Sequence, residues 1–248
     1  MANLVIDIGN TALKAAWADG MTIGKTFRYQ GERLMDFILS ITSRNKPEIM
    51  VLSSVRHFSQ QNIEILSGEC EKLLVVDGTM LRKYSLPEYL TSDRAASIIA
   101  ARFLFKGRGC TIFDFGSTLT VDFLDSKGYF EGGMISPGCR TRFKALNRYS
   151  KGLPLVVAPD EIEEKGNSLQ HSVASGVVTG IMFEIDGYIC RYPDNITVFT
   201  GGDAIYFAKR MKNSIFVVCN LVLMGLALIA VESDDHENDC SADVKVTK

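Results

Sequence analysis

The sequence has little of what several function classes require. Its 248 residues include only three histidines, which lie far apart at His57, His171 and His236, so little is available for a histidine metal site. Lys and Arg total 27 against 29 Asp and Glu, a net charge of −2. The basic excess that is typical of nucleic-acid-binding proteins is therefore absent, and no nucleic-acid partner is expected.

Paired cysteines and membrane-length apolar runs are also lacking. The six cysteines form no C-x-x-C pair and no zinc spacing, which favours reduced side chains in a reducing compartment. The first residues lack the basic segment of a signal peptide. The uncharged segment 215–231 is shorter than the roughly 20 apolar residues of a membrane span and contains Asn220 and Gly225. We therefore predict a cytoplasmic protein without a membrane partner, and a buried strand followed by a buried helix in this segment.

Apolar runs alternate with helical patterns along most of the chain. Strands are expected at 4–6, 49–52 and 73–76, and helices at 34–41, 59–66 and 93–105. This alternation predicts an α/β protein. The stretch Lys106–Gly109 is the best boundary, giving an N-terminal half at 1–108 and a C-terminal half at 109–248, the latter ending in a frayed acidic tail.

One internal repeat organises the chain. Leu4–Thr11 is echoed by Thr111–Thr118, and each copy is an apolar strand that ends in D-x-G-[NS]-T. Asp7 and Asp114 are 107 residues apart (114 − 7), about the size of one average domain. The repeat predicts a duplicated α/β fold of two similar halves with a cleft between them.

The repeated turn suits phosphate binding. Its glycine allows close approach of the backbone to an anion, and successive N–H groups form an anion-binding concavity. The aspartate at the strand end can hold a hydrated cation that screens phosphate charge. Either copy alone is more often a plain tight turn, but the repetition favours the phosphate interpretation.

Three other glycine-containing segments are less specific. Gly20–Thr26 resembles a P-loop, but three residues separate its glycines instead of four, so a hairpin turn is predicted. Gly132–Gly138 and Thr200–Asp203 are each expected between a strand and a helix. They are equally consistent with plain turns and with a surface for a flat ligand such as a purine or ribose.

Asp93 begins the predicted helix 93–105. From position alone it is favoured as an N-cap, whose carboxylate accepts backbone N–H bonds. A helix N-terminus also favours the ionised carboxylate, which is the form that accepts a proton from a substrate hydroxyl. The basic residues of 140–148 predict a solvated helix face.

The order of these motifs resembles one family, the type III pantothenate kinases. Their superfamily also contains acetate and sugar kinases, Hsp70 and actin. The resemblance covers nearly the whole chain and rests on Asp7–Thr11, Tyr84-x-x-Pro87-x-x-Leu90-x-x-Asp93-Arg94, Asp114-x-Gly116-Ser117, Gly132–Gly138, Leu153-Pro154, Thr200–Asp203 and Leu221–Leu226. It implies a duplicated ribonuclease-H-like (actin-like ATPase) fold, with a nucleotide cleft between its two similar halves. It also implies phosphorylation of pantothenate by ATP to 4′-phosphopantothenate, the first step towards coenzyme A.

The resemblance also implies roles for individual residues. The ATP-phosphate loop would comprise Asp7, Ile8, Gly9, Asn10, Thr11, Ala12, Leu13 and Lys14, with Ser117 from the second turn. Asp7 would hold Mg²⁺ through water, and Asp114 would bind a monovalent cation, K⁺ or NH₄⁺. Asp93 would accept the proton of pantothenate, in a substrate site with Tyr84, Thr91, Ser92, Arg94 and Leu169, the last contributed across a homodimer interface.

Two departures from the family pattern stand in the substrate site. Thr91 replaces the usual glycine of Gly-x-Asp-Arg, and Leu169 replaces a threonine, with Ser168 beside it. Two other functions therefore remain open. One is a catalytically weakened member that acts as a regulatory accessory protein for transcription, and the other is an actin- or Hsp70-like ATPase.

Overall fold

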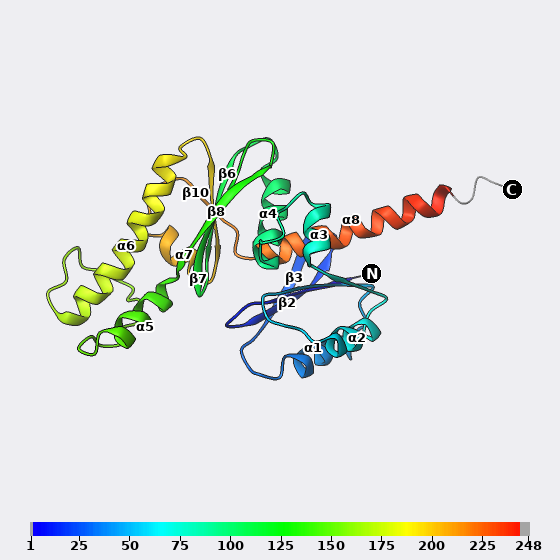
Figure 1. Cartoon of the computed structure of the whole chain (residues 1–248), viewed down its shortest axis with the longest axis horizontal. Helices are drawn as coiled ribbons and strands as arrows, with labels where there is room; N and C mark the ends of the chain where they lie inside the picture. The colour runs from blue at the N-terminus through cyan, green and yellow to red at the C-terminus, as the bar shows by residue number, and fades with distance from the viewer. Residues whose placement is uncertain (1, 244–248) are drawn as a thin grey trace. The chain divides into compact units, whose positions relative to one another are not determined.

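The computed structural model describes residues 2–243, and the side chains of residues 2–234 (Figure 1). The chain forms two compact units. One contains the residues up to Phe103 together with those from Asn220 onwards, and the other contains Leu104–Cys219. The predicted ranges 1–108 and 109–248 differ from this division because the chain returns to the first unit for its last helix.

The first unit is built on a five-stranded sheet in the order β3-β2-β1-β4-β5. Its strands are β1 (Asn3–Ile8), β2 (Leu13–Asp19), β3 (Thr22–Tyr29), β4 (Ile49–Ser54) and β5 (Lys72–Val75). Its helices are α1 (Leu34–Thr42), α2 (Gln60–Gly68), α3 (Gly78–Lys83), α4 (Ser92–Leu104) and α8 (Leu221–Asp243). Strands β1, β2 and β3 pair antiparallel, whereas β4 and β5 continue the sheet in parallel from β1.

The second unit contains a sheet in the order β10-β9-β6-β7-β8. Its strands are β6 (Cys110–Phe115), β7 (Thr118–Leu124), β8 (Phe130–Pro137), β9 (Ile196–Gly201) and β10 (Ile215–Val217). Its helices are α5 (Cys139–Tyr149), α6 (Leu169–Arg191) and α7 (Ala204–Ala208). An antiparallel β6-β7-β8 meander is extended in parallel by β9 and β10, as in the first unit.

The two sheets confirm the duplication that the repeat predicts, because β1 to β5 correspond one by one to β6 to β10. The two turns differ in length, however. Ile8 pairs with Leu13, which leaves four residues in the first turn, whereas Phe115 pairs with Leu119, which leaves three in the second. The repeat thus conserves the strands and the glycine, but the first turn is the wider one.

The first sheet is covered by its own helices on both faces. In the first unit, Leu4, Ile6 and Ile8 of β1 are fully buried in a cluster that also contains residues of α1 and α2. Their spacing of two residues is the period at which strand side chains share a face. In Figure 1, α1 and α2 lie on one side of this sheet and α8 on the other.

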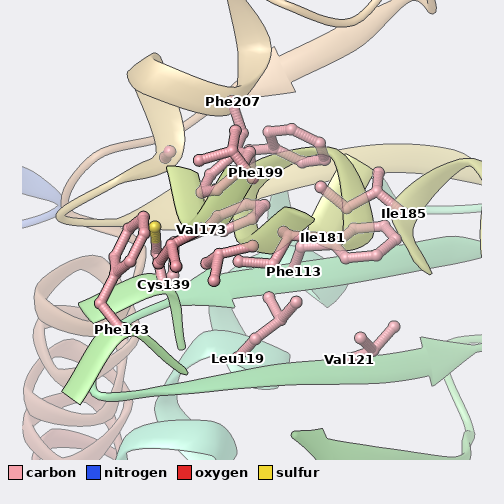
Figure 2. Packing of buried hydrophobic residues seen from close by; sticks show 14 of the residues in the cluster. Phe113, Leu119, Val121, Cys139, Phe143, Val173, Ile181, Ile185, Phe199 and Phe207 are labelled. Atoms are coloured by element: carbon pink, nitrogen blue, oxygen red, sulfur yellow. The ribbon is translucent and has the colours of Figure 1, made fainter. Parts of the chain in front are cut away.

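The core of the second unit is rich in aromatic rings. Figure 2 shows its members, which include Phe113, Leu119, Val121, Phe199 and Phe207 from the sheet and α7, packed with Val173, Ile181 and Ile185 of α6. Phe115 lies 4.8 Å from Phe199 and 5.1 Å from Phe207, measured between ring centroids. Such ring pairs stabilise the unit beyond their buried area, and they hold the end of β6 against β9 and α7.

Most of the predicted strands and helices are confirmed. Gly20 has a positive φ of +55° and joins β2 to β3, as the hairpin interpretation requires. Two segments of the second unit differ from the prediction: Gly132 and Gly133 lie inside β8 rather than in a strand-to-helix turn, and β10 is partly exposed rather than buried. The acidic segment 232–239 lies within α8, and the last residues, 244–248, where a frayed tail was expected, lie outside the described residues.

Among the described residues, only α6 has the length and apolar composition of a helix that could cross a membrane. This finding alone is weak support for a span, since core helices of globular proteins pass the same test, and 39% of its most apolar window is buried. Its residues Val173, Val177, Val178, Ile181 and Ile185 belong to the core cluster. The packing of this face accounts for these buried apolar residues.

Helix α8 packs on the β1–β4 face of the first sheet and closely against α4. A methyl group built on Gly225 would overlap the backbone carbonyl of Ala96. Only a glycine therefore permits the two helices to approach at this point. This contact links the C-terminal helix to the helix that begins with Ser92 and Asp93.

Replacing Gly225 with alanine should lower the free energy of unfolding by about 1–3 kcal/mol, because the new methyl forces α8 and α4 apart. Chemical denaturation measures this effect. Gly68→Ala is the matched control in the same unit, since a methyl on this helical glycine meets no atom within 4 Å. Equal stability of the Gly225→Ala variant and the wild type would contradict the close packing.

Candidate functional site

The first D-x-G turn connects β1 to β2. Its backbone is closed by a 3.0 Å hydrogen bond from Gly9 N–H to the Ala12 carbonyl, while the Asn10 and Thr11 side chains are exposed. The guanidinium of Arg56, on the segment after β4, donates to the Asn10 carbonyl. A fixed positive charge therefore lies against a turn whose polar residues face solvent, and this arrangement suits an anionic ligand.

Asp7 lies at the end of β1 and is 6% exposed. Strand pairing places Lys14 opposite it on β2 and Ser53 opposite it on β4. Residues that are directly opposite in a sheet share one face. The pairing therefore brings a cation and a hydroxyl to the buried carboxylate at the edge of the turn.

A chain of hydroxyl groups connects Asp7 to the start of α4. The Ser53 hydroxyl lies 3.1 Å from Asp7 Oδ1 and 2.9 Å from Ser92 Oγ. Ser53 is fully buried and Ser92 is 6% exposed. Because Asp93 follows Ser92 directly, these contacts bring the residues predicted for phosphate binding and for proton transfer into one neighbourhood.

The Asp93 carboxylate is held on one oxygen. The Thr91 hydroxyl and the Arg94 N–H (2.8 Å) both donate to Oδ1. Among the described residues, these two are the hydrogen bonds of the Asp93 carboxylate, so Oδ2 can accept a hydrogen bond from a further donor. Helix α4 begins at Ser92, which places Asp93 inside the first turn rather than at the N-cap position that was favoured from sequence. Thr91, in place of a glycine, orients the carboxylate.

The donor set near the first turn matches the chemistry of Mg²⁺. No group of three or more His, Cys, Asp or Glu residues that could form an all-protein metal cage exists among the described residues. Mg²⁺ usually keeps several waters and binds through one or two carboxylates together with substrate phosphates. A single buried carboxylate, Asp7, beside a phosphate-sized turn fits this pattern.

The second D-x-G turn is supported by the start of α5. The Gly138 N–H (3.1 Å) and the Thr141 hydroxyl (2.6 Å) both donate to the Ser117 carbonyl. A methyl on Gly138 would overlap the Gly116 carbonyl, so this close approach requires a glycine. The Ser117 side chain itself stays exposed at the tip of the turn.

The third glycine segment packs against the same turn. Gly201 has a φ of +91°, and a methyl there would overlap the Asp114 carboxylate and the backbone of Phe115. The two glycine segments of the second unit therefore converge on the turn after β6. Burial raises the pKa of the nearby Asp203 carboxyl, whose backbone N–H lies 3.4 Å from the Phe115 carbonyl.

Tyr84, also predicted for the substrate site, makes hydrogen bonds with α8 and α4. Its hydroxyl donates to Glu232 of α8 at 2.5 Å, and Arg102 donates to its carbonyl at 2.7 Å. Burial, followed by the hydrogen bond and the charge of Glu232, raises the pKa of the Tyr84 phenol. Arg94, also predicted for the substrate site, is buried at 6% exposure.

Leu169 lies in the second unit as the first residue of α6. It is 54% exposed and lines a largely apolar cavity of about 520 Å³ together with Leu153 and Val173. The adjacent Ser168 caps α6 by accepting a hydrogen bond from the His171 N–H at 3.2 Å. The Ser168 hydroxyl, which could have replaced that of the missing threonine, is therefore engaged in capping α6.

Two residues of the neighbourhood were missed from sequence, Ser53 and Arg56. Both follow the apolar run 49–52 that was predicted as a strand. Ligands of α/β proteins bind outside the carboxyl ends of parallel strands. The position of these two polar residues, immediately after a second parallel strand, could therefore have identified them from the sequence.

The two sheets define the class of protein as an actin-like ATPase fold. A Baf family transcriptional activator from Campylobacter jejuni is similar with a TM-score of 0.66, at 20% identity over 94% of this chain and 99% of that chain. MreB5 of Spiroplasma citri bound to AMPPNP is similar with a TM-score of 0.52, at 11% identity over 96% and 98%. At these identities the likeness concerns the fold.

The chain belongs to the type III pantothenate kinase family, whose model matches residues 3–191. It is 39% identical to the type III pantothenate kinase of Cytophaga hutchinsonii over 231 residues, which cover 90% of this chain and 96% of the relative. It is 37% identical to that of Phocaeicola vulgatus over 246 residues, or 94% and 99% of the two chains. The resemblance found in the motifs is thereby confirmed.

The environment of Tyr84 predicts a late ionisation of its phenol. The phenolate is the charged form, which burial and Glu232 disfavour, so ionisation should occur well above the pH of about 10 at which free tyrosine titrates. The difference in near-ultraviolet absorbance between the wild type and Tyr84→Phe measures this midpoint.

Glu232→Gln should move the Tyr84 midpoint down, because it removes the negative charge beside the phenol, whereas Glu131→Gln in the second unit should leave it unchanged. A midpoint near pH 10 in the wild type would show that the phenol is exposed in solution.

Proposed function

We propose that this chain is a kinase that transfers the γ-phosphoryl group of ATP to the primary hydroxyl of pantothenate, giving 4′-phosphopantothenate for coenzyme A synthesis. The proposal is supported by family membership. The observation that supports it most in the structure is the buried contact from Asp7 through Ser53 to Ser92, the residue that precedes Asp93.

Different residues of the site meet the different requirements of phosphoryl transfer. Such transfer depends mainly on positioning and on neutralising charge. The first turn, Gly9–Thr11, presents backbone to the phosphates, and Arg56 and Lys14 supply positive charge beside it. Asp93 Oδ2 accepts the proton of the substrate hydroxyl as the new P–O bond forms, while ADP leaves with the electrons of the broken bond.

Two cations complete the proposed site. Mg²⁺, held through water by Asp7, would neutralise phosphate charge, which is the chemistry it supplies in other kinases. Asp114, at the second turn, would hold the monovalent cation, K⁺ or NH₄⁺. Its carboxylate lies against the backbone of Gly201, so closely that a methyl group on this glycine would overlap it.

We place the enzyme in the cytoplasm. The five cysteines whose side chains the structure describes are all free thiols. Burial raises the pKa of Cys110 and Cys139 to about 11, which keeps both protonated at neutral pH. Unpaired, unreactive thiols agree with a reducing compartment.

Release of ADP with and without pantothenate, in potassium buffer with Mg²⁺, tests the proposed reaction. We expect ADP release that depends on pantothenate and equals the 4′-phosphopantothenate formed. Release that is independent of pantothenate would identify an ATPase instead. No release in either condition would support the regulatory alternative.

Asp93→Asn serves as the catalytic control of that assay. Loss of the proton acceptor should lower turnover by roughly 10²- to 10⁴-fold with ATP affinity preserved. Asp36→Asn, on the exposed face of α1, should keep wild-type turnover. Near-normal turnover of the Asp93→Asn variant would remove Asp93 from the proposed mechanism.

We also propose a homodimer formed through the second unit. Its β8 strand is an edge strand that exposes Met134 and Ile135 at 41% and 60%, and α6 exposes Leu169 and Phe183 at 54% and 71%. Ser136 donates to Glu184 at 2.7 Å, which joins β8 to α6 beside these apolar residues. Large exposed apolar side chains on adjoining elements are typical of interaction surfaces.

Light scattering should give twice the 27.4 kDa mass of one chain. Phe183→Asp should shift the mass to that of the monomer, because it buries a charge in the interface. Ile65→Asp, on α2 of the first unit, should keep the dimer. A wild type that remains at 27.4 kDa at micromolar concentration would refute the homodimer.

A further inference from the structure

A buried polar chain crosses three elements of the first unit. Ser53 of β4 is fully buried, and its hydroxyl lies between Asp7 Oδ1 at 3.1 Å and Ser92 Oγ at 2.9 Å. Asp7 and Ser92 are each only 6% exposed. The contacts span 46 and 39 residues of sequence, so they connect elements that local structure would leave independent.

The direction of both hydrogen bonds follows from the proton inventory. An ionised carboxylate only accepts, and a serine hydroxyl has a single proton to donate. Ser53 therefore donates to Asp7 and accepts from Ser92. The Ser53 hydroxyl is bonded on both sides, and losing either neighbour leaves one hydrogen-bonding capacity of this buried hydroxyl unmet.

We infer that Ser53 is a positioning residue for phosphoryl transfer, one that fixes the start of α4, and with it Asp93, relative to Asp7 and the first turn. The inference rests on the proposed function. Transfer needs the attacking hydroxyl and the phosphoryl group in near-attack geometry, and a displacement of about 1 Å is enough to lose roughly 100-fold in rate. Ser53 controls that geometry without contacting either substrate.

The same helix supplies a matched control. Ser97 of α4 is 2% exposed, and its hydroxyl has no hydrogen-bond partner. Ser97→Ala therefore removes a buried hydroxyl from α4 without breaking the chain to Asp7. Ser53→Ala and Ser92→Ala break the chain from the strand side and from the helix side.

Steady-state kinetics of pantothenate phosphorylation distinguish positioning from a structural role. Ser53→Ala should lower kcat by about 10- to 100-fold, with a smaller change in the KM for ATP. Ser92→Ala should cause a similar loss, and Ser97→Ala should keep the kcat of the wild type. Thermal unfolding and nucleotide binding of each variant establish that the compared proteins are folded.

Double variants show whether the residues act as one unit. The Ser53→Ala/Ser92→Ala variant should be no slower than the slower single variant, because either change breaks the same chain. Adding Ser53→Ala to Asp93→Asn should cause no further loss, since Ser53 acts through Asp93. Losses that multiply in either pair would overturn the inference.

The wild type and Asp93→Asn are measured in the same series, so that a failure of the proposed function can be distinguished from a failure of the positioning role of Ser53. If the wild type transfers phosphate and Asp93→Asn does not, a Ser53→Ala kcat within two-fold of wild type refutes the positioning role alone. If the wild type makes no 4′-phosphopantothenate, the proposed function and this inference fail together. If Asp93→Asn stays active while the wild type transfers phosphate, the inference fails with the role of Asp93, and the proposed function stands. Should Ser53→Ala fail to fold, Ser92→Ala decides the question by the same criteria.

Discussion

The parallel pairing of β1 with β4 is the constraint on which the candidate site depends. Its register sets Asp7 beside Ser53, at the strand ends where the first turn and the Arg56 segment emerge. Backbone hydrogen bonds along the two strands hold this register, and a slip by one residue would move Leu4, Ile6 and Ile8 from the face that packs on α1 and α2 to the opposite face of the sheet. The burial of apolar side chains thereby fixes the position of a polar site.

Duplication supplied two similar frameworks that serve different purposes. The first turn has four residues, exposes Asn10 and Thr11, and is accompanied by Arg56. The second has three residues, and Gly138 and Gly201 approach it and the end of β6 so closely that a methyl group on either would overlap the backbone there. The same strand and glycine pattern thus yields a wider turn in one unit and a shorter turn with two close glycines in the other.

Much of the fold was predictable because its signals are local. The strand periodicity, the hairpin at Gly20 and the D-x-G repeat each depend on a few adjacent residues, and the structure confirms them. The Gly132-Gly133 pair was misassigned to a turn because a glycine pair also occurs within an edge strand such as β8, where the neighbouring strand decides. The return of α8 to the first unit was missed because it depends on contact between Gly225 and Ala96, distant in sequence.

The sequence by itself determined the family, the class of fold and the residue types of the turns, since these reside in short motifs in a recognisable order. Only the tertiary structure decided which of those residues meet. It joined Asp7 to Ser92 through Ser53, gave Thr91 a role in holding Asp93, and brought the Tyr84 hydroxyl to the Glu232 carboxylate of α8. The physical reason is that hydrogen bonds between distant residues arise from strand register and helix packing, to which no single local pattern corresponds.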